Sequence, residues 1–291
     1  MSDKSATPGH GTASVALAGV MDSPLLRDLQ GGVWRRPRLI ASPWKRWALI
    51  LGFLLYLAFA LGSVDINWDR VAQGMSRGWR FISAFASPDF ISRSGEIIEG
   101  LVESLAMTVV ATAIGIVISI PVGLGAARNL APAPVYMFCR AWVGLARAFP
   151  EIIFAILFVK MFGFGPLAGM LTLVVASVGF LAKLLADEIE TLDRSQMEAV
   201  RSTGASWLQW VNYAIQPQIM PRLAGLSLYR LDINFRESAV IGIVGAGGIG
   251  ATLNTSFDRY EFETAAAILL LIIVIVMMAE YASGYLRKAL Q

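Results

Sequence analysis

Charged and polar residues interrupt an otherwise apolar part of the sequence between Leu223 and Gly250. The run from Leu228 to Ser238 contains Arg230, Asp232, Asn234, Arg236 and Ser238. A charge at the centre of a membrane helix costs about 2.5–3.5 kcal/mol on insertion scales, so such residues persist where they are paired or line a wet cavity. Asp232 and Arg236 stand four residues apart and can pair on one helical face. Two interpretations remain: a structural ion pair, or a translocation path in which Arg230 or Arg236 favours passing anions.

A second charged pair lies in the apolar stretch from Val135 to Phe162. Arg147 and Glu151 are again four residues apart, and Pro150 between them is expected to kink the helix because it has no amide hydrogen. Charges beside a kink within a membrane are typical of binding or gating positions. The pair can equally neutralise itself, so a pathway role and a structural role both stay open.

Glycines cluster between Gly242 and Gly250, where a literal G-x-G-x-x-G pattern falls. A dinucleotide-binding interpretation would need a strand–helix–strand unit, and an apolar stretch of helical length follows instead. We therefore reject it. Clustered glycines near the outer end of a membrane helix permit close backbone packing or an unwound turn. We expect a gate or an interface between two copies here, with plain helix packing as the alternative; the residues concerned are Gly245, Gly247, Gly248 and Gly250.

A polar segment from Glu198 to Gly204 separates two long apolar runs. We expect Glu198 and Ala199 to open a short helix, Gly204 to break it, and residues 207–214 to form a second helix that Pro217 interrupts. A bent helical pair that projects from a membrane domain suits docking on a partner protein. The residues assigned to this contact are Glu198, Ala199, Gly204, Ala205, Trp207 and Pro217.

Several classes of chemistry are excluded by residues that the sequence lacks. The one histidine, His10, lies in a Gly/Ser/Thr/Ala-rich tail, and Cys139 is the one cysteine, so neither a metal cluster nor a disulfide is expected. No G-x4-G-K-[ST] pattern occurs, so we expect this chain to bind no ATP itself. A formal net charge of +3 is too small to suggest a nucleic-acid partner. We expect no enzyme and no bound cofactor.

Composition indicates that the lipid bilayer solvates much of the chain. Hydrophobic residues make up 56% of the sequence and charged residues 15%, against roughly 25% charged in soluble domains. Six stretches approach the length of about 20 residues that a membrane helix needs. They are Trp47 to Val64, Ser104 to Ala127, Val135 to Phe162, Pro166 to Ala186, Leu223 to Gly250 and Thr264 to Leu286. The predicted fold class is an all-α integral membrane protein with about six transmembrane helices.

Basic residues flank the first and last of these stretches: Arg35, Arg36, Arg38, Lys45 and Arg46 before, Arg287 and Lys288 after. Because positive charge favours the cytoplasmic side, both termini and the Glu198 segment are predicted to be cytoplasmic. Three regions follow: a cytoplasmic tail (1–46), a first transmembrane helix with an outer connection (47–100), and a core (101–291) with a cytoplasmic coupling loop (190–222). Residues 20–42 suit either an amphipathic element on the inner membrane face or a floppy tether.

Several short motifs between Leu101 and Arg287 occur together in one family. They are Ala127–Asn129, Arg147–Glu151, Gly165–Gly169, Lys183 with Glu188–Glu190, Glu198–Gly204, Pro217–Gln218, Leu228–Arg236 and Gly245–Gly250. With these motifs the sequence resembles the membrane subunit of phosphonate-type ABC importers, in the type I permease group that includes the methionine permeases. The Glu198 segment resembles the EAA loop of such permeases, although Ala214 and Gln216 depart from its usual pattern.

The resemblance implies a permease subunit in the plasma (inner) membrane that works as a homodimer. It further implies two copies of a cytoplasmic ABC ATPase, which hold ATP and Mg²⁺, and an extracytoplasmic phosphonate-binding protein that delivers the ligand. The expected cargo is a phosphonate or a related phosphorus oxyanion. Alternatives are a methionine or other amino-acid permease, a membrane-embedded enzyme and a passive channel; the absence of catalytic residues opposes the enzyme.

Overall fold

The computed structural model describes residues 42–63 and 67–290, with side chains up to Tyr285. It confirms the predicted all-α class, because every regular element in these residues is a helix. The chain divides into two compact units, 1–68 and 69–291. The predicted tail falls almost wholly outside the described residues, as do Arg35, Arg36 and Arg38.

The first unit contains helix α3 (Pro43–Gly62). Pro43 stands in its first turn, where the missing amide hydrogen costs nothing because that group has no partner inside the helix. Its twenty residues are apolar enough to cross a membrane, as the first predicted span requires.

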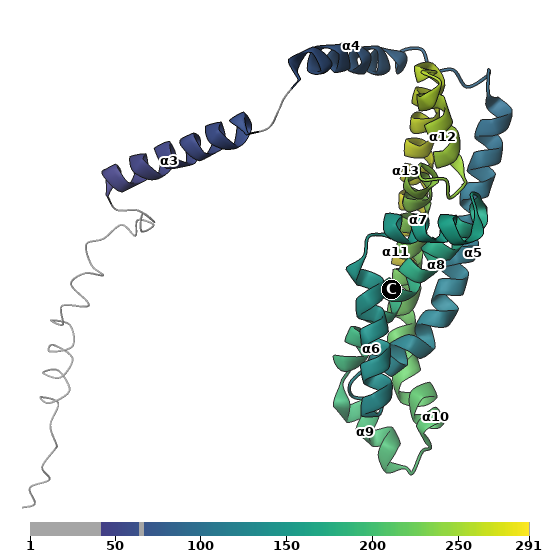
Figure 1. Cartoon of the computed structure of the whole chain (residues 1–291). Helices are drawn as coiled ribbons and strands as arrows, with labels where there is room; N and C mark the ends of the chain where they lie inside the picture. Colours follow the sequence, from purple (N-terminus) through teal and green to yellow (C-terminus); the bar gives the residue numbers. More distant parts are fainter. Residues whose placement is uncertain (1–41, 64–66, 291) are drawn as a thin grey trace, which may run out of the picture. The chain divides into compact units, whose positions relative to one another are not determined.

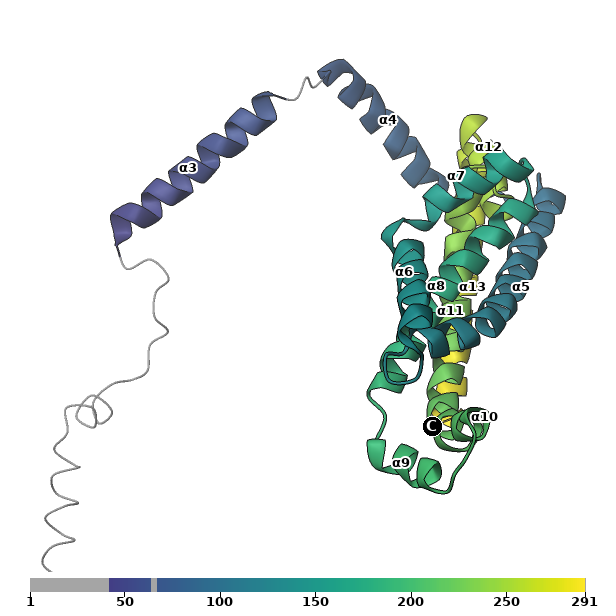
Figure 2. The same cartoon turned by 60° about the horizontal axis from the view of Figure 1, so that its bottom comes forward.

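The second unit is a helical bundle. Six of its helices are α5 (Ser94–Ala126), α6 (Ala133–Ala148), α7 (Glu151–Phe162), α8 (Pro166–Glu190), α11 (Gln216–Gly242) and α13 (Phe262–Leu290). Its other elements are α4 (Trp68–Ala84), α9 (Arg194–Ser202), α10 (Trp207–Trp210), the π-helix η1 (Val211–Ile215) and α12 (Ile249–Asp258). In both views α9 and α10 lie at one end of the bundle and α12 at the other (Figures 1 and 2).

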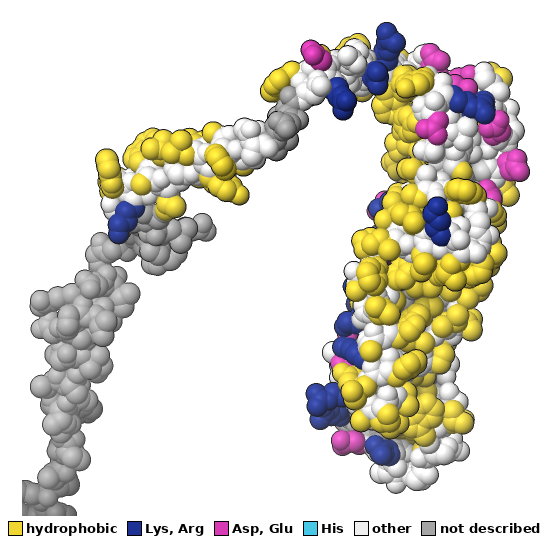
Figure 3. All heavy atoms as spheres, viewed as in Figure 1, with side chains coloured by type: hydrophobic (Ala, Val, Ile, Leu, Met, Phe, Trp, Pro, Cys, Tyr) yellow, Lys and Arg dark blue, Asp and Glu magenta, His cyan; other side chains and the backbone are white. Residues whose placement is uncertain are grey.

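Helix α8 forms the centre of the bundle and packs against α5, α6, α7 and α11. Small residues allow this close approach: a Cβ added at Gly115 of α5 would lie 2.6 Å from the Ser177 Cβ, and one at Gly179 would lie 2.9 Å from the Ala146 Cβ. Membrane helices commonly pack through small residues in this way, because lipid tails supply no hydrophobic drive between them. On the face that Figure 3 shows, apolar side chains cover most of the middle of the bundle, and most charged side chains lie toward its ends.

Among the described residues four helices, α3, α5, α8 and α13, are long and apolar enough to cross a membrane, and α6 with α7 makes a fifth if the bent pair is one span. The spans therefore number fewer than the six predicted. The stretch from Val135 to Phe162 differs from the expected single kinked helix, because α6 and α7 meet at 93°. Phe149 and Pro150 have extended ψ angles of 138° and 146°. Phe149 is extended because a proline disfavours the helical conformation of the residue before it. The stretch from Leu223 to Gly250 also divides, because α11 ends at Gly242.

Candidate functional site

Arg230 is the buried centre of an ionic cluster between three helices. Its Nε donates a hydrogen bond to Ser177 Oγ of α8 at 3.1 Å, and its Nη2 donates one to Glu237 Oε2 of α11 at 3.1 Å. The same nitrogen lies 4.0 Å from Glu151 Oε1, the first residue of α7, and the guanidinium stands over the Phe180 ring. One guanidinium, 3% exposed, therefore joins the broken helix α7 to α8 and α11.

Asn234, one turn further along α11, completes this polar layer. Its Nδ2 donates hydrogen bonds to Thr112 Oγ1 of α5 and to Ser177 Oγ, both at 2.8 Å. The Ser177 hydroxyl can donate to Asn234 Oδ1 at 3.2 Å. Because Asn234 is fully buried, these bonds replace those that water would supply. We name the set Glu151, Ser177, Arg230, Asn234 and Glu237 the Arg230 cluster.

Asp232 and Arg236 form the ion pair that their spacing predicts, with 2.8 Å between Asp232 Oδ2 and Arg236 Nη2. The Arg236 side chain is 58% exposed, whereas Asp232 is buried. The second Asp232 oxygen has no hydrogen-bond partner among the described residues, nor has Thr108 Oγ1. Both residues line a cavity of about 270 Å³ between α5, α11 and α13. The polar residues of α11 thus divide between two sides of the helix.

The break at Pro150 separates Arg147 from Glu151, which pairs with Arg230 instead. The expected Arg147–Glu151 pair is therefore wrong: within the described residues Arg147 is exposed and makes no ion pair. Ser238 lies apart from both groups and donates to the Phe235 carbonyl of its own helix. Sequence reasoning missed Glu237, although its spacing of seven residues from Arg230, two helical turns, indicates a shared face.

The glycine tract forms an irregular turn between α11 and α12. Gly245, Gly247 and Gly248 have φ angles of +90°, +79° and +72°, which residues with a Cβ rarely adopt. The turn packs on the loop before α8, where the Gly165 amide donates to the Gly245 carbonyl at 3.0 Å. The Gly248 amide donates to Glu103 Oε2 at 2.8 Å. The glycines therefore provide both an unwound turn and close backbone contact between two loops at the α12 end.

Gly250 differs from the other three glycines of this set because it lies inside α12. A Cβ at this position would collide with the Ala239 carbonyl oxygen of α11. Its role is thus close packing of α12 against α11.

At the opposite end, α9, Gly204 and α10 form a projecting bent pair. Asp193 caps α9 by accepting a hydrogen bond from the Ser195 amide, so the helix begins before Glu198, and Glu198 and Ala199 lie within it rather than opening it. Gly204 has a φ angle of +80° and follows the end of α9 at Ser202, so the helix breaks there as predicted.

Ser206 begins α10 with a capping box, in which its hydroxyl and the Gln209 side chain each accept from the other's amide. The Trp210 indole donates to the Met197 carbonyl at 2.9 Å and ties the pair together. Trp207 is exposed, and Ala205 is half-buried. The pair therefore presents an ordered surface at the α9 end.

Pro217 does not interrupt the second helix of the pair. The π-helix η1 follows α10 directly, and the Gln216 amide bonds to the Val211 carbonyl, five residues back. Pro217 then stands in the first turn of α11, where a missing amide hydrogen is tolerated. The chain is consequently helical without a break from Trp207 to Gly242.

Charged residues near the α9 end of α8 form a network of ion pairs. Arg140 of α6 pairs with Asp187 at 3.4 Å and lies 3.8 Å from Glu190. Lys183 also contacts Asp187, and the Arg128 amide donates to Glu190 at 2.9 Å. These contacts hold in place the end of α8, from which the chain continues into α9.

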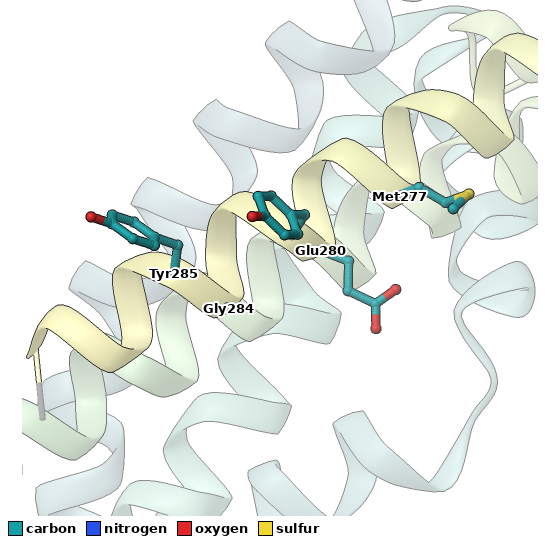
Figure 4. Close-up of a pocket in the computed structure, with 5 residues that line it drawn as sticks. Met277, Glu280, Gly284 and Tyr285 are labelled. Carbon is teal, nitrogen blue, oxygen red and sulfur yellow. The ribbon is translucent and has the colours of Figure 1, made fainter.

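The exposed face of α13 carries a shallow hollow lined by Met277, Glu280, Tyr281, Gly284 and Tyr285. The Glu280 carboxylate extends away from Tyr285 (Figure 4). Among the described residues nothing faces this hollow from another helix, and we assign it no function.

The chain is similar to known membrane transport proteins. Residues 119–290 match the family model described as binding-protein-dependent transport system inner membrane component. The chain is 47% identical over 204 residues to the phosphate-import permease protein PhnE of Mycolicibacterium smegmatis, covering 70% of this chain but 38% of that relative. It is 37% identical to the phosphite transport system permease protein PtxC of Stutzerimonas stutzeri, covering 94% of this chain and 96% of the relative.

Among solved structures, the inward-facing MetNI methionine ABC transporter gives a TM-score of 0.62 at 27% identity, covering 69% of this chain and all of that one. The D-methionine permease MetI of Escherichia coli is 28% identical over 53% of this chain and 72% of its own length. Identity to the phosphate and phosphite permeases is therefore higher than identity to the methionine permeases.

Proposed function

The chain belongs to the family of binding-protein-dependent transport system inner membrane components, and on that premise we propose that it is the permease subunit of an ATP-driven importer for phosphonates or related phosphorus oxyanions. Two relatives named for phosphate and phosphite transport support this cargo at 47% and 37% identity. The methionine alternative is less well supported, because the D-methionine permease of Escherichia coli is 28% identical.

One observation carries the proposal: the ordered bent pair at the α9 end, which presents exposed side chains beyond the bundle. Trp207, Leu208 and Tyr213 are large, apolar and exposed there. Such residues suit a partner protein better than water. The partner is an ABC ATPase that holds ATP and Mg²⁺. The contact residues are Glu198, Ala199, Gly204, Ala205 and Trp207, together with Pro217 in the first turn of α11.

The full assembly contains two copies of this chain, two ATPase subunits and an extracytoplasmic binding protein. The permease lies in the plasma (inner) membrane with both termini cytoplasmic. This orientation puts the bent pair on the side where ATP is available, and it puts the glycine turn at the outer surface. Gly245, Gly247 and Gly248 then form part of an outer gate together with the loop before α8.

Arg147 is the cation best suited to assist anion passage. Arg230 is compensated by Glu151 and Glu237, and Arg236 by Asp232, whereas Arg147 has no carboxylate partner among the described residues. An uncompensated charge attracts an anion more strongly than a paired one. The Arg230 cluster and Pro150 instead hold the two halves of the broken helix in place.

Uptake by reconstituted subunits tests the proposal. Vesicles that contain this chain and its ATPase, supplied with the binding protein encoded beside it, are given phosphonates, phosphite, phosphate and methionine. We expect ATP-dependent uptake of a phosphorus oxyanion and none of methionine. Arg147→Gln should lower the uptake rate several-fold, whereas the matched change Arg222→Gln should not. Methionine uptake without uptake of any phosphorus compound would refute the cargo.

A further inference from the structure

Helix α4 (Trp68–Ala84) is strongly amphipathic, and the sequence analysis placed it in the outer connection without assigning it a helix. Five of its apolar residues follow one another at intervals of three or four, which aligns them on one face of the helix. They are Trp68, Val71, Met75, Trp79 and Ile82. All five are exposed; Met75 is 73% exposed and Trp79 is 71% exposed. We name this face the α4 stripe.

The opposite side of α4 is polar and basic. It carries Gln73 and the arginines Arg70, Arg77 and Arg80, against one acidic residue, Asp69. Helices with an apolar face containing tryptophan and a polar face rich in arginine typically lie in the plane of a membrane surface. Tryptophan prefers this level because its ring is apolar and its N–H is polar.

The order of elements along the chain also places α4 at a membrane surface. Helices α3 and α5, which precede and follow α4, are both apolar and long enough to cross a membrane. The chain that joins two successive crossings begins and ends at the same membrane surface.

The carboxyl end of α4 is fixed to the bundle itself. The Phe81 ring lies 5.4 Å from Phe257 of α12 and 6.1 Å from Phe262 of α13 between centroids. This contact holds α4 at the level where α12 lies (Figure 1).

We propose that α4 lies in the lipid–water interface, with the α4 stripe among acyl chains and its arginines at lipid phosphates. A bilayer satisfies both faces at once, because it offers apolar chains beside anionic headgroups. The helix then anchors the α12 end of the permease to the membrane surface and fixes how deeply the neighbouring glycine turn lies.

Site-directed spin labelling in the full chain tests this. Cys139, the one cysteine, is first changed to serine, and single nitroxide labels are placed at 71, 75 and 79 on the stripe and at 73 and 76 outside it. The protein is reconstituted in phosphatidylcholine–phosphatidylglycerol vesicles, and collisions with oxygen and with a water-soluble nickel chelate are compared. We expect oxygen to dominate at 71, 75 and 79 and nickel at 73 and 76.

A charge on the stripe supplies a second measurement. With the label at 79, Met75→Glu should raise nickel accessibility several-fold, whereas the matched change Gln73→Glu on the polar side should not. Equal nickel access at all five labelled positions would show a helix in water and overturn the proposal. Low access of both reagents at 71, 75 and 79 would show that protein covers the stripe, which overturns it equally.

Discussion

Replacing Arg230 by methionine should destabilise the chain more than any other loss of one arginine from α11. The change leaves the Glu237 carboxylate, 3.1 Å from the guanidinium, without its buried partner, and Glu151 loses its own pairing at 4.0 Å. Breaking a buried pair costs about 3–5 kcal/mol, and the 24% exposure of the Glu237 side chain places the expected loss near the lower end, about 3 kcal/mol. The unfolding constant should rise about a hundredfold.

Two further variants make the Arg230 test specific. Arg222→Met removes a pair on the same helix whose arginine is 61% exposed, and it should cost about 0–1 kcal/mol. Adding Glu237→Gln to Arg230→Met removes the stranded charge and should restore about 1–3 kcal/mol. Unfolding in detergent micelles, followed by tryptophan fluorescence, measures all three. Equal stability of Arg230→Met and Arg222→Met would refute the buried cluster.

Two glycine positions give further predictions. Gly204→Val puts a residue with a Cβ at a φ angle of +80°, at a cost of about 1–2 kcal/mol, and should raise the amount of ATP hydrolysed per substrate imported. Gly204→Asn should not, because asparagine tolerates this conformation. The same ratio of ATP hydrolysed to substrate imported in both variants would contradict the role of the turn. Gly169→Ala puts a Cβ against the Ala246 carbonyl and should lower the thermal unfolding temperature, whereas Gly144→Ala, which meets nothing within 4 Å, should leave it unchanged or raise it.

The helical class and most spans could be predicted from the sequence, because a bilayer demands long apolar runs. The Asp232–Arg236 pair and the break at Gly204 were also predictable, since each depends on spacing or residue type within one element. The partners of Glu151 were not. The turn at Pro150 redirects α7 by 93°, and only the assembled bundle shows that Glu151 meets Arg230 rather than Arg147.

Two other features depend on local detail that a search for long apolar runs overlooks. The π-helix before Pro217 arises where the backbone shifts its bonding by one residue to accommodate the proline, and no single residue marks it. Helix α4 alternates apolar residues with arginines and other polar residues, as interfacial helices do, so it contains no long apolar run. The interval between its apolar residues was nevertheless present in the sequence.

The uninterrupted helix from Trp207 to Gly242 has a mechanical consequence. Thirty-six residues at about 1.5 Å each give about 54 Å of helix along its axis, from the bent pair to the glycine turn. Helices bend at prolines and at π-helical segments, and both η1 and Pro221 lie near the start of this one, so a tilt imposed at Trp210 reaches Gly242 through the unbroken stretch that follows Pro221. Translation of this helix along its axis would break the contacts that Arg230 and Asn234 make with α5, α7 and α8. Tilting of the helix about Arg230 is therefore the less costly motion.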